Sequence, residues 1–281
     1  DYLVCIDSDG CAFDSMEIKH KECFIPMMIK HWDLQPISKY ARMAFEFVNL
    51  YSQSRGVNRF PALVETFDLL REWDVVAARN VAIDPIPNLK AWVKAESKLG
   101  NPALKAYVAA HPDQEDMVKT LAWSVAVNDF IAALVKNVRP FPLVQESLQR
   151  ITERADAFVC SGTTQHTLQE EWDEHQISQY VFTIAGQEQG KKAEHIALAG
   201  KGKYDPAKIL MIGDAPGDQK AAKANGALFF PICPGSEEAS WERLYNEGLD
   251  RFFAGTFAGA YEDGLIAEFN AILPSTPPWA K

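Results

Sequence analysis

Short apolar segments alternate with helical stretches from about residue 140 onward, and this alternation limits the possible folds more than any other feature. Helices are expected to begin near Thr164, Lys192, Gly217 and Glu237. Between them, short runs rich in Val, Ile and Phe are typical of buried strands: residues 155–162, 181–186, 208–215 and 227–233. The pattern predicts a doubly wound α/β fold, a parallel sheet with helices on both faces, which the apolar run at residues 2–6 is expected to join.

Residues 16–138 follow a different pattern. Their apolar positions recur at intervals of three and four, which is typical of amphipathic helices, and Pro85, Pro87, Pro102 and Pro112 interrupt the stretch. No segment there has the features of a strand. The sequence therefore predicts two domains: an α/β core formed by residues 1–15 and 139–281, and an all-helical domain, residues 16–138, inserted after the first strand.

Composition and charge exclude some classes of partner. The 281 residues include 47% hydrophobic and 23% charged side chains, and the net charge is −10 with no dense basic run. We therefore expect no nucleic-acid or membrane partner, whereas a small anionic substrate stays compatible with this charge. The five cysteines show no Cys-x-x-Cys spacing, and no signal peptide is visible, so we expect a cytoplasmic protein. The apolar residues 120–135 contain Ser124, Asn128 and Asp129, which favour a buried helix over a membrane span.

Polar motifs follow three of the predicted strands. Asp7 and Asp9 follow the first, Ser161 follows residues 155–160, and Asp214 and Asp218 follow residues 208–213. A lysine pair, residues 191 and 192, opens a predicted helix. Because ligands of open parallel sheets bind beyond the carboxyl ends of the strands, we expect these groups to meet at one edge.

The chemistry of these groups fits phosphoryl transfer. Asp7 is the expected nucleophile, since a carboxylate can form a covalent intermediate, and Asp9 is the expected general acid and base. A carboxylate and a phosphate repel each other, so a cation is needed, and Mg²⁺ prefers such oxygen ligands. We predict a Mg²⁺ site whose candidate ligands share one residue type: Asp7, Asp9, Asp214 and Asp218.

Other residues are expected to hold the phosphoryl group. Ser161 and Lys192 are the predicted catalytic partners of its oxygens, and Lys191 is the weaker choice for the lysine. Gly10, Gly162 and Thr163 are predicted to contact the substrate, with Gly10 letting the backbone pass close to the site.

These motifs resemble those of the haloacid dehalogenase superfamily. Asp7-Ser8-Asp9-Gly10 matches its first motif, Ser161 its second, Lys192 its third and Gly213-Asp214 through Asp218 its fourth. The resemblance covers the core and implies a Rossmann-like fold, with residues 16–138 similar to the helical cap that some members carry after the first motif. Because dehalogenase and phosphonatase branches lack an acid at the position of Asp9, the resemblance implies a phosphatase or phosphomutase.

Other interpretations of these motifs explain less. A polar turn would suffice for Asp7 and Asp9 alone, but three further motifs in order favour catalysis. An EF-hand loop would need a carboxylate where Ile18 stands, and no Gly-x-Gly-x-x-Gly for a dinucleotide follows any predicted strand.

The inserted domain is expected to set specificity. Arg55 and Arg59 flank a predicted break between two helices, where their guanidinium groups can bind an anionic substrate or can be surface charges. His20, shortly after the first motif, is a third candidate for substrate binding.

We therefore predict a Mg²⁺-dependent phosphoric monoester hydrolase that acts on a small phosphorylated metabolite through an aspartyl-phosphate. A sugar phosphate is the class that cap-bearing relatives imply. Two alternatives stay open, a phosphomutase with the same chemistry and a protein that binds phosphate esters without turnover. The sequence makes no prediction of oligomeric state.

Overall fold

The computed structural model describes residues 2–280, which fall into two compact units. One unit, the core, comprises residues 2–16 and Asn137–Leu273, and the other, the helical unit, comprises Glu17–Lys136 and residues 274–280. The predicted boundaries at residues 15/16 and 138/139 lie within two residues of these divisions.

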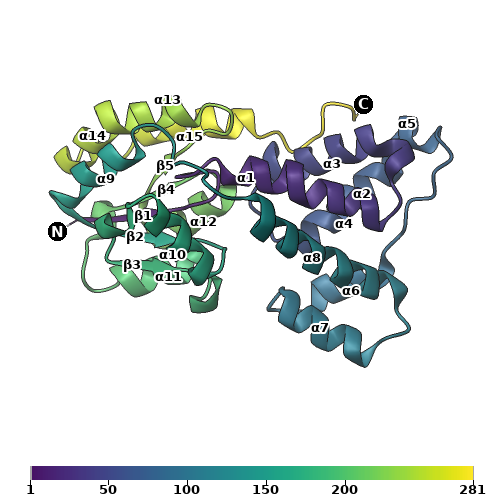
Figure 1. Ribbon diagram of the computed structural model, residues 1–281. Helices are drawn as coiled ribbons and strands as arrows, with labels where there is room; N and C mark the ends of the chain where they lie inside the picture. Colours follow the sequence, from purple (N-terminus) through teal and green to yellow (C-terminus); the bar gives the residue numbers. More distant parts are fainter. Residues whose placement is uncertain (1, 281) are drawn as a thin grey trace. The chain divides into compact units, whose positions relative to one another are not determined.

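The core contains a five-stranded sheet in the order β3-β2-β1-β4-β5, in which all neighbouring strands are parallel (Figure 1). Its strands are β1 (Tyr2–Ile6), β2 (Ala155–Cys160), β3 (Thr183–Ala185), β4 (Ile209–Gly213) and β5 (Leu228–Pro231). Its helices are α9 (Val144–Thr152), α10 (Gln165–Glu174), α11 (Lys192–Gly200), α12 (Pro216–Ala224), α13 (Glu237–Arg243), α14 (Leu249–Ala254) and α15 (Ala260–Ile272). The predicted doubly wound α/β fold is confirmed.

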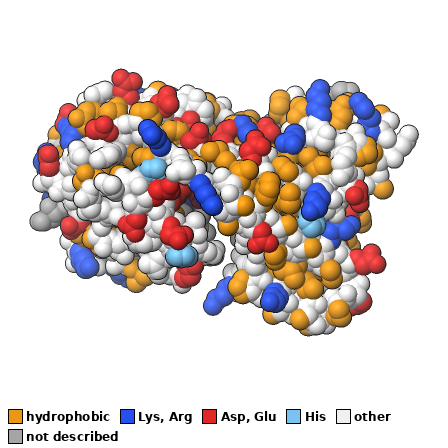
Figure 2. Space-filling view, viewed as in Figure 1, with side chains coloured by type: hydrophobic (Ala, Val, Ile, Leu, Met, Phe, Trp, Pro, Cys, Tyr) orange, Lys and Arg blue, Asp and Glu red, His pale blue; other side chains and the backbone are white. Residues whose placement is uncertain are grey.

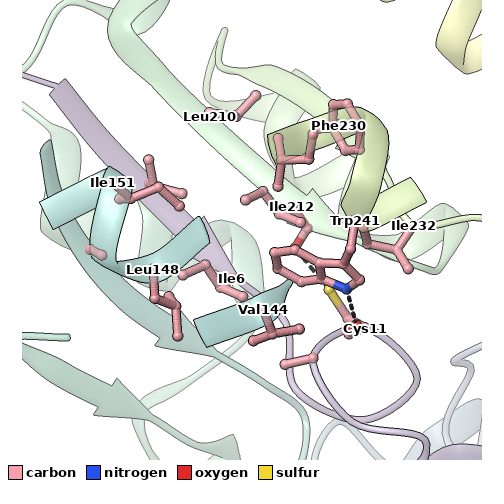
Figure 3. Packing of buried hydrophobic residues seen from close by; sticks show 14 of the residues in the cluster. Ile6, Cys11, Val144, Leu148, Ile151, Leu210, Ile212, Phe230, Ile232 and Trp241 are labelled. Atoms are coloured by element: carbon pink, nitrogen blue, oxygen red, sulfur yellow. Dashed lines mark hydrogen bonds between the residues drawn. The ribbon is translucent and has the colours of Figure 1, made fainter. Parts of the chain in front are cut away.

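Side-chain alternation along the strands explains the helices on both faces. In β1, Val4 and Ile6 belong to one buried cluster and Leu3 and Cys5 to another, because successive side chains of a strand point to opposite faces. Residues of α9, α10, α13 and α14 fill the first cluster, part of which Figure 3 shows, and residues of α11 and α12 fill the second. The strands are therefore apolar on both sides, as in other covered parallel sheets.

All regular elements among the described residues of the helical unit are helices. They are α1 (Ser15–Ile18), which begins in the core, a π-helical segment (Lys19–Phe24), α2 (Ile25–His31), a 3₁₀ turn (Gln35–Ile37), α3 (Ser38–Leu50), α4 (Arg59–Glu72), α5 (Asp74–Ala77), α6 (Pro87–Ala95), α7 (Asn101–Ala110) and α8 (Glu115–Leu134). They enclose a separate apolar cluster that contains Phe45, Phe67 and Trp123. The unit therefore has its own core, as expected for an independent domain.

Residues 120–134 of the apolar segment lie in α8, and the predicted buried helix is only partly buried. Trp123 and Val127 are buried, but Val118 and Val125 are 42% and 43% exposed. On the face shown in Figure 2, apolar side chains of the helical unit lie among charged ones. Among the described residues, α8 is the one helix that is long and apolar enough to be a candidate membrane span. Of its most apolar 18-residue segment, 28% is buried. A core helix that covers one side of a domain passes the same test.

The end of the chain differs from the predicted domain division. Residues 274–280 were assigned to the core, but they group with the helical unit because the ring of Trp279 stacks on Trp73, with centroids 4.2 Å apart. Trp279 also meets Phe47 edge to face, and the N–H of Gln53 donates to the carbonyl of Pro274. The chain thus passes between the two units three times, after Met16, after Lys136 and after Leu273.

Candidate active site

Asp7 lies at the carboxyl edge of the sheet because it directly follows β1. Its N–H donates to the carbonyl of Ile212 on β4 at 3.0 Å, which extends the strand pairing by one residue. Its side chain is buried, and the N–H of Ser8 donates to Asp7 Oδ1 at 2.8 Å. The carboxylate is therefore held in one orientation at the point where ligands of parallel sheets bind.

Asp214 and Asp218 come from the end of β4 and the first turn of α12. Both are buried, and Asp218 Oδ2 accepts a hydrogen bond from the N–H of Ala215 at 3.0 Å. A carboxylate in the first turn of a helix is stabilised by the unpaired backbone N–H groups there. Gly213 permits this turn, because a Cβ at that position would lie 2.5 Å from atoms of the Asp218 side chain.

Lys192, the first residue of α11, joins two of these carboxylates. Its Nζ lies 2.5 Å from Asp7 Oδ2 and 2.5 Å from Asp218 Oδ1. Burial alone would lower the pKa of Lys192, but the charges of Asp218 and Asp7 outweigh it and raise the pKa well above its usual value. The lysine is therefore a permanent cation in this site. Its neighbour Lys191 caps α11 through its backbone N–H, which donates to Glu194.

The pKa of Asp7 is raised, although a carboxylate paired with a lysine usually has a lowered pKa. Burial raises it well above its usual value, Lys192 opposes the rise, and the charges of Asp218 and Asp214 add to it. The charge of Lys192 therefore offsets only part of the effect of burial and of the neighbouring carboxylates on Asp7.

The three carboxylates fit a divalent cation. One oxygen from each of Asp7, Asp214 and Asp218 lies within 4.8 Å of the others, and all three residues are buried. Three carboxylates and one ammonium group leave a formal charge of about −2, which a divalent cation neutralises, since buried charges need compensation. An all-oxygen donor set of this kind suits a hard cation such as Mg²⁺.

Gly213→Ala tests the tight turn that sets this spacing. We expect it to lower the free energy of unfolding by about 1–3 kcal/mol through overpacking, and to weaken Mg²⁺ binding by moving Asp218. Urea unfolding and calorimetric titration with Mg²⁺ measure the two effects. The matched control is Gly217→Ala on α12, because a Cβ there meets no atom within 4 Å. Equal stability and equal Mg²⁺ affinity in the two variants would contradict the assigned role of Gly213.

Asp9 is held apart from the carboxylate cluster. Thr163 Oγ1 donates to Asp9 Oδ2 at 2.8 Å, and Ser15 Oγ donates to Asp9 Oδ1. Asp9 was predicted both as a general acid and as a metal ligand, and it is not part of the three-carboxylate group. Its carboxylate accepts hydrogen bonds from two hydroxyl groups instead.

Ser161 and the residues after it lie at the end of the neighbouring strand. The N–H of Ser161 donates to the carbonyl of Ala185, and the N–H of Thr163 donates to Ser161 Oγ at 3.2 Å. No atom lies within 4 Å of a Cβ built on Gly162, so the backbone is open there. Gly10 has a φ of +77°, a conformation that favours glycine and makes the sharp turn after Asp9.

Sequence reasoning missed Ser15 and gave Thr163 a different role. Thr163 was predicted to contact the substrate, and its hydroxyl is bonded to Asp9. Ser15 lies six residues after Asp9, at the start of α1, and a serine is common at the start of a helix, so its residue type gave no signal. Only the folded turn brings these hydroxyls to one carboxylate.

The three candidate residues of the helical unit have contacts within that unit. Arg55 Nη1 donates to the carbonyl of Leu50, and the His20 ring stacks on Phe24. The predicted break between helices lies at residues 51–58, between α3 and α4.

Arg59 joins α4 to α8. Its Nη1 donates to Ser124 Oγ at 3.1 Å and to Asn128 Oδ1 at 2.8 Å, and its guanidinium lies over the ring of Phe24. These bonds account for two of the three polar side chains that interrupt the apolar sequence of α8, Ser124 and Asn128.

The fold and the site define a class before any comparison. A parallel sheet that presents one strand-end aspartate, two further carboxylates and a lysine at its carboxyl edge is typical of hydrolases that act through a nucleophilic carboxylate. The model of the family described as haloacid dehalogenase-like hydrolase matches residues 77–231, just over half of the chain. The chain belongs to the haloacid dehalogenase-like hydrolases.

Solved structures share the fold. A haloacid dehalogenase-like family hydrolase from Streptococcus pneumoniae is 15% identical, with a TM-score of 0.51 over 87% of this chain and 90% of that one. A protein named as a phosphoglycolate phosphatase from Lactobacillus delbrueckii subsp. bulgaricus is 12% identical, with a TM-score of 0.50 over 89% of this chain and 97% of that one. No curated protein sequence matches the chain.

Proposed function

We propose that the protein is a Mg²⁺-dependent phosphatase that hydrolyses a small phosphorylated metabolite through an aspartyl-phosphate on Asp7. The observation that carries the proposal is the group of three buried carboxylates, Asp7, Asp214 and Asp218, with Lys192 bonded to two of them. A separate carboxylate, Asp9, lies two residues after the nucleophile. A binding protein that only holds a phosphate ester needs no second acid at that position.

Asp214 and Asp218, with Asp7, would hold Mg²⁺ at the edge of the sheet. When bound, the cation offsets the repulsion between the Asp7 carboxylate and the phosphate ester. Lys192 supplies a second, fixed positive charge next to Asp7, and Ser161 supplies a hydroxyl for a phosphoryl oxygen.

In the first step, a carboxylate oxygen of Asp7 attacks phosphorus, and the bond between phosphorus and the ester oxygen breaks. Asp9, in its protonated form, gives its proton to that oxygen, so that the alcohol leaves neutral. The products of the step are the free alcohol, the phosphorylated Asp7 and the ionised Asp9.

In the second step, Asp9 takes a proton from a water molecule while that water attacks phosphorus. The bond between phosphorus and Asp7 breaks, inorganic phosphate leaves, and Asp9 is protonated again for the next cycle. The hydroxyl groups of Ser15 and Thr163 orient Asp9 when it is ionised, because both donate to its carboxylate.

The helical unit is proposed to act as a cap that sets specificity. Substrate contacts by His20, Arg55 and Arg59 stay predictions, as do sugar phosphates as the substrate class. The bonds of Arg59 to Ser124 and Asn128 support a structural role for that residue beside any role in binding.

The test is release of inorganic phosphate from a panel of phosphorylated sugars, polyols, nucleotides and amino acids, with p-nitrophenyl phosphate as a general probe. We expect release with Mg²⁺ and loss of at least about 10²-fold with a chelator, since the cation offsets the charge repulsion at the reacting centre. Restoring Mg²⁺ should restore the rate.

The same assay separates the alternatives. A phosphomutase would convert one phosphate ester to another with little phosphate released at steady state. A protein that only binds phosphate esters would show affinity for them but neither reaction. Phosphate release that is equal with Mg²⁺ and with chelator would contradict the proposed role of the carboxylate cluster.

A further inference from the structure

The turn that carries Asp7 and Asp9 is folded around one carbonyl group. The carbonyl of Ser8 accepts hydrogen bonds from the N–H groups of Cys11, Ala12 and Phe13, at 3.2, 2.9 and 3.1 Å. The N–H of Gly10 closes the turn by donating to the carbonyl of Phe13 at 2.8 Å. The residue between the two acids is therefore the centre of the turn.

A buried tryptophan holds the side chain of that central residue. Trp172 of α10 and Ser8 are both fully buried, and the indole Nε1 of Trp172 donates to Ser8 Oγ at 3.0 Å. Ser8 Oγ in turn donates to Glu171 Oε2 at 3.3 Å. Ser8 is thus held through its hydroxyl by α10 as well as through its carbonyl by the turn.

A second buried tryptophan holds the far side of the same turn. The indole Nε1 of Trp241, on α13, donates to the carbonyl of Cys11 at 2.8 Å, and Cys11 Sγ donates to the carbonyl of Ile212 at 3.6 Å. Figure 3 shows both bonds and the packing of the Trp241 ring among apolar side chains of the sheet. The turn is therefore tied to helices from two separate parts of the chain.

Trp172 and Trp241 differ from Trp32 and Trp92 of the helical unit because their indole N–H groups donate hydrogen bonds. They are the tryptophans of the core, and each donates to this turn. In the helical unit, Trp32 and Trp92 are buried with indole nitrogens that have no hydrogen-bond partner, so packing alone accounts for them. A phenylalanine would fill much of the apolar volume at residues 172 and 241, but it could not donate these bonds.

We propose that Trp172 and Trp241 are positioning residues that fix the turn and so keep Asp7 and Asp9 in register for phosphoryl transfer. The catalytic part of this inference rests on the proposed function, whereas the structural part, an ordered turn, does not. Catalytic groups must be held within a fraction of an ångström, and a displacement of about 1 Å can cost about 10²-fold in rate. Because neither indole touches the reacting atoms, each acts through the turn.

The experiment compares Trp172→Phe, Trp241→Phe and the double variant with the control Trp92→Phe, which loses an indole N–H that bonds to nothing. With p-nitrophenyl phosphate and Mg²⁺, we expect kcat to fall about tenfold or more in each single variant, with KM nearly unchanged. A smaller folded fraction would also lower the apparent kcat with KM unchanged, so each rate is divided by the concentration of folded protein, measured by urea unfolding. The control should keep the wild-type kcat.

Amide hydrogen exchange of Cys11, Ala12 and Phe13 supplies a readout that needs no activity. We expect exchange about tenfold faster in both core variants, the scale of one lost hydrogen bond, and unchanged in Trp92→Phe. If Trp172→Phe does not fold, Ser8→Ala replaces it, because it removes the acceptor of Trp172 and leaves the ring in place.

Unchanged exchange, or faster exchange with unchanged kcat, would overturn the inference. If the wild-type protein hydrolyses no ester in the panel, the proposed function fails, and the exchange measurement by itself then decides whether the indoles order the turn.

Discussion

Asp7→Asn is expected to abolish turnover while leaving the fold intact. The amide is a poor nucleophile and cannot form the acyl phosphate, so kcat should fall by at least about 10⁴-fold, the scale seen when an enzyme loses its nucleophile. Stability should change little, because burial and the charges of Asp218 and Asp214 already disfavour the ionised form of Asp7. Replacing it with a neutral, isosteric side chain removes that unfavourable charge.

Phosphate release and urea unfolding measure the two parts of this prediction. The matched control is Asp263→Asn on α15, an exposed aspartate of the core, for which we expect wild-type kinetics. Wild-type kcat in Asp7→Asn would exclude Asp7 as the nucleophile. A loss of folded protein in that variant alone would instead show that the carboxylate stabilises the core.

Asp9→Asn is expected to slow both chemical steps, and the leaving group should decide how much. Loss of a general acid and base costs about 10²–10⁴-fold, and an alkyl phosphate should show that loss in full because its alkoxide needs a proton to leave. p-Nitrophenolate leaves without one, so the first step should survive and the phosphorylated enzyme should accumulate. The time course of p-nitrophenol release should therefore show a rapid burst followed by slow turnover.

Stopped-flow measurement of the burst, together with steady-state rates on p-nitrophenyl phosphate and a sugar phosphate, tests this assignment. The Asp263→Asn control should show neither a burst nor a leaving-group effect. Equal losses on the two substrates would contradict a proton transfer by Asp9 to the leaving oxygen. If Asp9→Asn hydrolysed both substrates at the wild-type rate, Asp9 would have no part in the reaction.

The α/β fold was predictable because buried parallel strands leave a local signal. Residues 209–213 and 228–231 are short, apolar on both faces and followed by small or polar residues, so the pattern identified β4 and β5 directly. The order of the polar motifs along the chain then predicted that Asp7, Lys192 and Asp218 would meet, since parallel strands end at one edge. The structure brings these three side chains within hydrogen-bond distance.

The remaining features depend on contacts that no local pattern encodes. Trp172 reaches Ser8 across 164 positions of sequence, and Thr163 reaches Asp9 across 154. An indole N–H or a threonine hydroxyl looks the same in sequence whatever it bonds to.

The position of the last residues was missed for the same reason. Trp279 belongs to the helical unit, where its ring stacks on Trp73. A contact between two aromatic side chains so far apart in the sequence produces no periodic pattern from which it could be predicted. The exposure of α8 was misjudged because its apolar residues lie on all sides of the helix, so hydrophobicity alone did not tell which side is covered.

The central claim is that a phosphoryl group is carried on Asp7, and chemical trapping tests it most directly. Asp9→Asn is mixed with p-nitrophenyl phosphate and Mg²⁺, quenched in acid during the burst, and treated with borohydride, which reduces an aspartyl-phosphate to homoserine. Mass spectrometry of the peptide that contains residues 2–16 then locates the change. We expect homoserine at position 7, and none without Mg²⁺ or in the Asp7→Asn, Asp9→Asn double variant. A burst of p-nitrophenol with Asp7 unmodified, or with the reduced residue elsewhere, would contradict the claim.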